Sequence, residues 1–248
     1  MKTPSHASGI AGFRRSAGFT LTETVIAIGV LAVLLTGFIA VFTPAAQGIR
    51  RSISSEQADR LTTALEMELT TLRKGQETPE PATGFDKAFD WIRGGNAAAT
   101  AIFVYQYRGD PTSTRADGTP EPKSAITGEP GKDYIVQSMA RRLGDAELVK
   151  DLTAIEGSVF FVKPIQLVFE SGELKPGKAG EIAFFEGAPP AKTVATTSAA
   201  YKEAVIAFSA EFHNVPTKSI AYLKSSTFAT RFGNASKPVF TRNLAVRR

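Results

Sequence analysis

Residues 13–46 read FRRSAGFTLTETVIAIGVLAVLLTGFIAVFTPAA, and this stretch decides how the chain is built. From Val25 to Phe42 it holds eighteen residues without a charge, of which only Thr36 is overtly polar. As a helix these residues extend roughly 27 Å, which is close to the hydrocarbon thickness of a bilayer. The sequence therefore predicts a helix that spans a membrane.

Basic residues flank the apolar run on both sides. Arg14 and Arg15 precede it, and Arg50 and Arg51 follow it. Residues 1–18 carry three cations and no acid, and such a basic excess favours the cytoplasmic side of a membrane. We therefore expect a single pass through the inner membrane, with a cytoplasmic N-terminus and a periplasmic head.

Three kinds of N-terminal segment fit a basic leader before an apolar run. A secretory signal needs an apolar core of about 7–15 residues and a small-x-small cleavage site, whereas residues 42–46 make a poor site. A plain transmembrane anchor explains the length but not Glu23, because a carboxylate in a membrane span costs up to about 2.5–3.5 kcal/mol. The third kind, a prepilin signal, accounts for this residue.

Residues 17–23, AGFTLTE, carry a family resemblance. Behind a basic leader and ahead of an apolar helix, they resemble the processing signal of type IV pilins and pseudopilins. The resemblance implies that a prepilin peptidase cleaves after Gly18 and methylates the new N-terminal amine of Phe19. It also implies that Glu23, the fifth mature residue, serves assembly with other pilin or pseudopilin subunits. The chain faintly resembles the Verru_Chthon cassette group of pilin-like proteins as well, although no motif carries that likeness.

Glu23 also has a simpler interpretation. Thr20-x-x-Glu23 fits the capping-box pattern, and a carboxylate in the first turn of a helix interacts favourably with the helix dipole. Capping and assembly therefore stay open as alternatives for this side chain.

The apolar helix is expected to continue beyond the membrane. Pro44 and Gly48 interrupt it, and an apolar stripe at helical spacing then follows on one side: Ile53, Ala58, Leu61, Leu65, Leu69 and Leu72. We predict one long helix over 19–74, kinked near Pro44. The expected organisation is a leader at 1–18, a transmembrane helix at 19–43, its amphipathic continuation at 44–75 and a globular head at 76–248.

The head is expected to be α+β, with the long helix packed on an antiparallel sheet, as in pilins. The pattern predicts helices at 85–92 and 145–155 and a long loop at 109–132. Predicted strands lie at 101–107, 134–139, 159–170, 181–185, 203–212, 219–223, 227–232 and 239–246. Turn residues separate these strands, which is typical of antiparallel sheets. Six phenylalanines are expected in the sheet core or its hairpins: Phe160, Phe161, Phe169, Phe184, Phe185 and Phe208.

Composition excludes several kinds of chemistry. The chain has no cysteine, so disulfides, thiol nucleophiles and cysteine–metal sites are excluded. His213 has no second histidine after loss of the leader. Residues 172–179 nearly match a P-loop but lack its hydroxyl and a following helix, so a turn is expected there. Asp110 and Asp117 are expected to be solvated and not to bind calcium.

The charge distribution argues against nucleic acid as a partner. Residues 213–248 carry seven cations and no acid, residues 1–18 carry three, and the remainder has a net charge of −5. We expect the C-terminal cations to be solvated. No cofactor, metal or catalytic residue is predicted.

These patterns together predict a structural subunit of a type IV pilus or type II secretion pseudopilus, not an enzyme. Removal of the leader leaves 230 of 248 residues, which favours a minor subunit. The alternative is a membrane-anchored periplasmic binding protein that never joins a filament, and an anchored hydrolase is a third.

Overall fold

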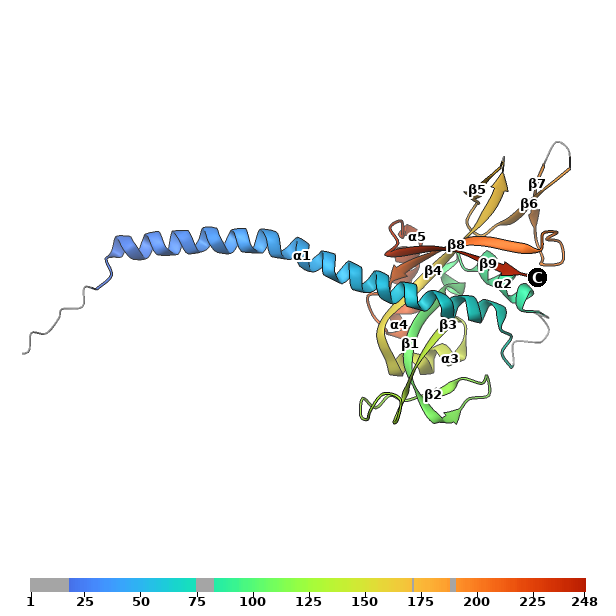
Figure 1. Cartoon of the computed structure of the whole chain (residues 1–248), viewed down its shortest axis with the longest axis horizontal. Helices are drawn as coiled ribbons and strands as arrows, with labels where there is room; N and C mark the ends of the chain where they lie inside the picture. Colours follow the sequence, from blue (N-terminus) through green and yellow to red (C-terminus); the bar gives the residue numbers. More distant parts are fainter. Residues whose placement is uncertain (1–17, 75–82, 171, 188–190) are drawn as a thin grey trace, which may run out of the picture. The chain divides into compact units, whose positions relative to one another are not determined.

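The structure is a computed structural model that describes residues 18–74, 83–170, 172–187 and 191–248. The chain divides into two compact units, Met1–Ile49 and Arg50–Arg248 (Figure 1). Helix α1, Leu21–Thr70, supplies the described helix of the first unit and the first element of the second.

Helix α1 is continuous through Pro44 and Gly48, which confirms the prediction of one long helix across these residues. Proline lacks an N–H and removes one backbone hydrogen bond, but the residues on both sides keep the helix. The helix starts and ends slightly inside the predicted 19–74. Thr36, the polar residue of the apolar run, donates its hydroxyl to the carbonyl of Ala32 at 2.8 Å, so no hydroxyl is left unsatisfied there.

The predicted apolar stripe of α1 packs on the second unit over its last three turns. Ala58, Leu61, Leu65 and Leu69 are each at most 2% exposed. The stripe begins later than predicted, because Ile53 is 51% exposed. This part of α1 therefore forms the core of the second unit together with the elements that follow it.

A second helix, α2 (Gly84–Gly94), confirms the helix predicted at 85–92. It begins with a capping box between Thr83 and Asp86. Its Lys87 is buried and donates Nζ to Glu68 Oε1 of α1 at 2.6 Å and to the carbonyl of Thr71 at 2.6 Å. A buried ion pair thus holds the end of α1 to α2.

The second unit is built around an antiparallel sheet, as predicted. Its main strands follow the order β1 (Ile102–Thr114), β4 (Ile155–Glu170), β8 (Val205–Asn214) and β9 (Phe240–Arg247). Strands β2 (Pro120–Pro122) and β3 (Ile135–Arg142) both pair with β1, and β5 (Glu173–Pro176) pairs with β4. Strands β6 (Ile182–Glu186) and β7 (Ala191–Ala195) form a separate hairpin.

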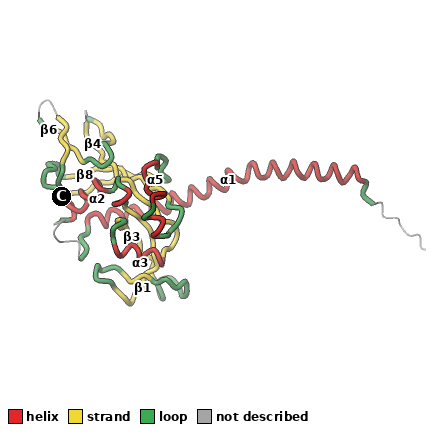
Figure 2. The backbone as a smooth tube through the Cα atoms, turned by 180° about the vertical axis from the view of Figure 1, so that it is seen from behind, coloured by secondary structure: helices red, strands yellow, loops and turns green. Residues whose placement is uncertain are grey.

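Side chains alternate between the two faces of this sheet, because successive residues of a strand point to opposite sides. Val104 and Phe160 belong to the core that α1 and α2 share. Phe103 and Phe161 belong to a second core on the other face. That second face is covered by α3 (Ala146–Asp151), α4 (Ile220–Leu223) and α5 (Ser226–Asn234). Figure 2 shows the strands of this unit with the helices around them.

Some predictions for the head are wrong. The segments 219–223 and 227–232, predicted as strands, are the helices α4 and α5. The predicted loop at 109–132 contains the end of β1 and all of β2. The turn predicted at 172–179 contains β5, and β7 was not predicted. Phe169, expected in the sheet core or a hairpin, lies opposite Leu174 in the β4–β5 hairpin but is 65% exposed.

Candidate functional site

The residues predicted for processing lie immediately before α1. Gly18, Phe19 and Thr20 stand outside the helix and are exposed, and the Phe19 side chain is 89% exposed. Cleavage of a peptide bond needs a backbone that a peptidase can reach, and a bond inside a helix is not accessible in this way. The Gly18–Phe19 bond therefore lies outside the helix, and cleavage at this bond stays a prediction.

Thr20 and Glu23 form a complete capping box at the start of α1. The backbone N–H and the hydroxyl of Thr20 both donate to Glu23 Oε2 at 2.9 Å. In return, the backbone N–H of Glu23 donates to Thr20 Oγ1 at 3.2 Å. The reciprocal bonds satisfy groups that a helix start leaves unpaired. The capping interpretation of Glu23 is thus confirmed, while its assembly role stays a prediction.

The helix that follows exposes an unbroken apolar surface. From Val25 to Phe42 every residue is exposed, and none of the most apolar 18-residue window of α1 is buried. Among the described residues, α1 is the one helix long and apolar enough to cross a membrane. Such a surface is unstable in water, so it needs lipid or other apolar helices around it.

The weak sequence motifs of the head have ordinary structural roles. The P-loop-like segment at 172–179 holds strand β5 and a turn, with no helix after it, so it forms no phosphate cradle. His213 stacks on Phe161, with ring centroids 4.9 Å apart, and its Nε2 lies 3.6 Å from Glu211 Oε2. Burial lowers the pKa of His213, which favours a neutral core imidazole.

Asp110 and Asp117, the residues considered for calcium, are not brought together as ligands. Asp110 accepts hydrogen bonds from the backbone and hydroxyl of Thr112, at 2.8 and 2.6 Å. Asp117, which was expected to be solvated, is instead largely buried and accepts a hydrogen bond from the guanidinium of Arg141 at 2.7 Å. No group of three or more His, Asp or Glu residues in the described parts of the chain has the arrangement to hold a metal ion.

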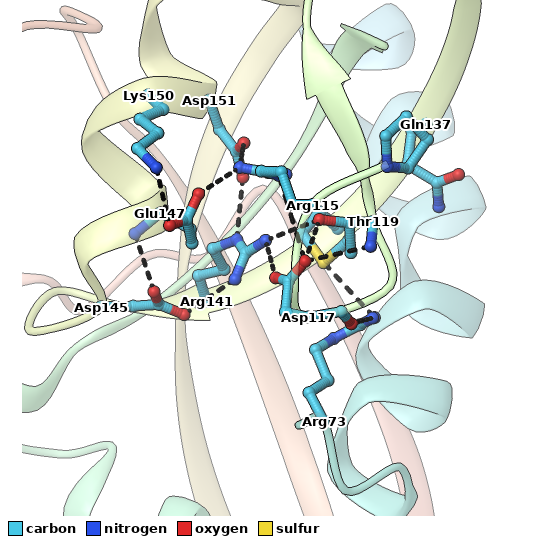
Figure 3. A network of polar contacts seen from close by, with 12 residues as sticks. Arg73, Arg115, Asp117, Thr119, Gln137, Arg141, Asp145, Glu147, Lys150 and Asp151 are labelled. Atoms are coloured by element: carbon cyan, nitrogen blue, oxygen red, sulfur yellow. Dashed lines mark hydrogen bonds and ion pairs between the residues drawn. The ribbon is translucent and has the colours of Figure 1, made fainter. Parts of the chain in front are cut away.

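One polar cluster of the head is a set of arginine–carboxylate pairs that the sequence analysis did not predict (Figure 3). Asp151 is fully buried, and its Oδ2 accepts from Tyr105 at 2.6 Å and from Arg141 at 2.8 Å. Its Oδ1 lies 2.8 Å from Arg115 Nη1. Arg115 also pairs with Glu147 at 2.9 Å.

This cluster holds the β1–β2 segment on the sheet. Burial acts against ionisation of Asp117, but hydrogen bonds from Thr119 and Arg141 hold its pKa far below the usual range. A carboxylate in that state is a poor general base. Arginines separated in sequence from their acids give no local motif, which is why sequence patterns did not reveal the cluster.

Comparison with known proteins points to the same N-terminal segment. Residues 13–39 match the family described as the prokaryotic N-terminal methylation motif. No curated protein and no solved structure matches the chain. The match covers Gly18, Phe19 and Glu23 together with most of the exposed apolar helix. The chain therefore carries a prepilin-type methylation signal at the start of a long apolar helix that continues onto an antiparallel sheet, and in both respects it is similar to type IV pilin-like proteins.

Proposed function

We propose that this protein is a structural subunit of a type IV pilus or secretion pseudopilus. A prepilin peptidase would cleave it after Gly18 and methylate the amine of Phe19. The observation that carries the proposal is the exposed apolar surface of α1 directly behind the methylation motif. Proteins of this family are typically non-enzymatic and structural.

The physical logic of assembly follows from this helix. Before assembly the apolar surface is covered by lipid, and in a filament it is covered by the same helix of other subunits. Both environments exclude water, so a lone carboxylate at Glu23 is unfavourable in either. Cleavage creates a positively charged amine at Phe19, four residues before Glu23. We propose that Glu23 pairs with this amine on a neighbouring subunit, which neutralises both charges and sets the register between helices.

The test replaces Glu23 with leucine. Glu23→Leu should reach normal levels in the membrane and be cleaved normally, but it should be lost from the sheared filament fraction. Glu66→Leu is the matched control, because Glu66 is also an exposed acid of α1 but lies on the head. This control should assemble like the wild type.

Two outcomes would contradict the proposal. If Glu23→Leu enters filaments at the wild-type level, Glu23 is a helix cap alone. If the wild-type chain stays in the membrane while other subunits of the same system form filaments, the protein is a membrane-anchored binding protein.

A further inference from the structure

One histidine is buried on the face of the sheet that α5 covers. Of the two histidines in the chain, His213 is the one outside the predicted leader, and it is 5% exposed. It lies directly across from Phe161 of β4, and the two rings are stacked with their centroids 4.9 Å apart. Histidine is the side chain whose ordinary pKa, about 6.5, lies close to physiological pH. The head therefore holds a titratable ring next to its second core.

Helix α5 packs on the same phenylalanine. Phe228 and Phe232 of α5 both contact Phe161, with ring centroids 5.7 and 5.1 Å from it. Phe161 is thus shared between the ring of His213 and the helix. A change in the charge of that ring therefore acts on the packing that holds α5 to the sheet.

The position suits a neutral ring and not a charged one. The Nε2 atom of His213 is buried and has no hydrogen-bond partner among the described residues. Glu211 Oε2 lies 3.6 Å from it, which is too long for a hydrogen bond. A neutral imidazole leaves one polar atom unpaired there. An imidazolium would in addition lose the hydration of its charge without a hydrogen-bonded counter-ion, which is far more unfavourable.

The charged residues around the ring are mainly cations. Glu211 lies directly across from Lys163 of β4, so its negative charge is shared between that lysine and the ring. Strand β9 places the uncharged Thr241 on the other side of Glu211. Burial and the charge of Lys163 together keep the pKa of His213 below its ordinary value, although Glu211 acts in the opposite direction. The elements packed around the ring contribute one acid and three cations: Glu211 on β8, Lys163 on β4, Arg231 on α5 and Lys237 after α5.

We propose that His213 is an acid-sensitive latch, and that protonation of its ring in mild acid loosens α5 from the sheet. When α5 separates from the sheet, water reaches the ring, which then binds a proton as an exposed histidine does. The open form therefore binds protons more readily than the packed form, and acid shifts the equilibrium toward it. Opening exposes Phe161, Phe228 and Phe232, so the head gains apolar surface in acid.

The size and the direction of the effect follow from proton linkage. A histidine whose pKa is lowered in the packed form stabilises that form above about pH 6.5, and this contribution is lost as the pH falls below that value. Between about pH 7.5 and pH 5.5 the open form gains up to about tenfold over the packed form, the limit for a packed ring that stays neutral. The latch involves a single head, so it goes beyond the proposed function and does not depend on a filament.

Amide hydrogen exchange of the full chain in detergent tests the latch, because it reports local opening. Rates at about pH 7.5 and pH 5.5 are compared after correction for the pH dependence of the chemical exchange step. We expect the amides of α5 to exchange severalfold faster in acid, whereas those of α2, on the other face of the sheet, keep their rates. Equal corrected rates for α5 would overturn the proposal. Slower exchange in acid would also overturn it, because the protonated ring would then pair with Glu211 and hold α5 more tightly.

Two variants identify the group that titrates. His213→Phe keeps a flat ring that can stack on Phe161 but cannot bind a proton, so its α5 should exchange at the same corrected rate at both pH values. A wild-type acid response in this variant would assign the effect to another group and overturn the proposal. Glu211→Gln keeps the histidine and removes the acid beside it, so the loosening in acid should be at least as large as in the wild type. Loss of the loosening in Glu211→Gln would show that Glu211 is the group that titrates, which would likewise overturn the proposal.

Discussion

At the scale of single residues, Glu23 has a capping role that the structure shows and an assembly role that we propose, and variants can separate the two. Its carboxylate completes the capping box with Thr20, and this bond requires no other subunit. The assembly role depends on the negative charge, whereas the capping role depends on the hydroxyl of Thr20 as well. A substitution at Thr20 therefore tests the cap without removing the charge.

We predict that Thr20→Ala is cleaved and enters filaments at close to the wild-type level. Loss of a cap typically costs about 1 kcal/mol of helix stability, which a long membrane helix can tolerate. Thr20→Ser, which keeps a hydroxyl, is the matched control. The measurement compares the amount of each variant in the sheared filament fraction. If Thr20→Ala fails to assemble as completely as Glu23→Leu, the cap and not the charge is what assembly requires.

At the scale of elements, the last turns of α1 are the part of the helix that stabilises the head. Leu65 is 1% exposed within this packed stripe, whereas Met67, two residues further on, is 64% exposed. The two side chains are similar in size. A difference between their alanine variants therefore reports burial and not the number of atoms removed.

Leu65→Ala should lower the free energy of unfolding of the head by about 2–5 kcal/mol, because it removes buried contacts and leaves a cavity. Met67→Ala should change it by less than about 0.5 kcal/mol. Urea unfolding of the full chain in detergent can be followed by the fluorescence of Trp91, the sole tryptophan, which is 6% exposed. Equal effects of the two variants would show that α1 is not packed in this way.

The arginine–carboxylate cluster makes the head sensitive to acid. The pKa of Asp117 is lower in the folded head than in the unfolded chain, so its ionised form contributes stability above the unfolded value of about 3.9. That contribution is lost as the pH falls below this value toward the folded pKa. The urea midpoint should therefore fall between about pH 4 and pH 2.

Asp117→Asn is the matched variant for this effect, because asparagine keeps the shape and loses the charge. It should lower the midpoint at neutral pH and reduce the drop of the midpoint in acid. If the urea midpoint of Asp117→Asn falls in acid by as much as that of the wild type, Asp117 does not contribute to the pH dependence of stability.

Sequence patterns predicted most of the helices and strands of the head. They failed for segments whose secondary structure depends on packing against other parts of the head. Alternation and turn residues located β1, β3, β4, β6, β8 and β9. The segments of α4 and α5 contain aromatic and β-branched residues that favour strands. Helix α5 forms because Ser225 caps its start and because Phe228 and Phe232, four residues apart, both pack on Phe161. A serine followed by two phenylalanines four residues apart was the sequence pattern that could have predicted a helix here.

The N-terminal site was predictable for a different reason. Gly18, Phe19 and Glu23 lie within one short continuous segment, so a local motif contains them. The buried ion pairs of the head join residues far apart in the sequence, such as Arg115 with Asp151. No local pattern contains both partners of such a pair.

At the scale of the whole molecule, the two units place different demands on their surroundings. The first exposes apolar residues throughout its described helix, whereas the second has two buried cores of its own. The second unit therefore has the core that independent folding requires.

A chain starting at Arg50 should be soluble, monomeric and folded, because the main exposed apolar surface is gone. Size-exclusion chromatography with light scattering should give the mass of one chain, and urea unfolding should be cooperative. Aggregation in mild buffer would show that the head core needs the N-terminal unit or partner subunits.

The central claim is that the N-terminal segment is a prepilin signal, and mass spectrometry of the N-terminal peptide tests it most directly. Protein isolated from a host with a prepilin peptidase should begin at Phe19 and carry one methyl group on its amine. The same protein from a host without the peptidase should keep its leader. A leader that remains attached in the presence of the peptidase, or a chain that begins near Ala46, would contradict the account.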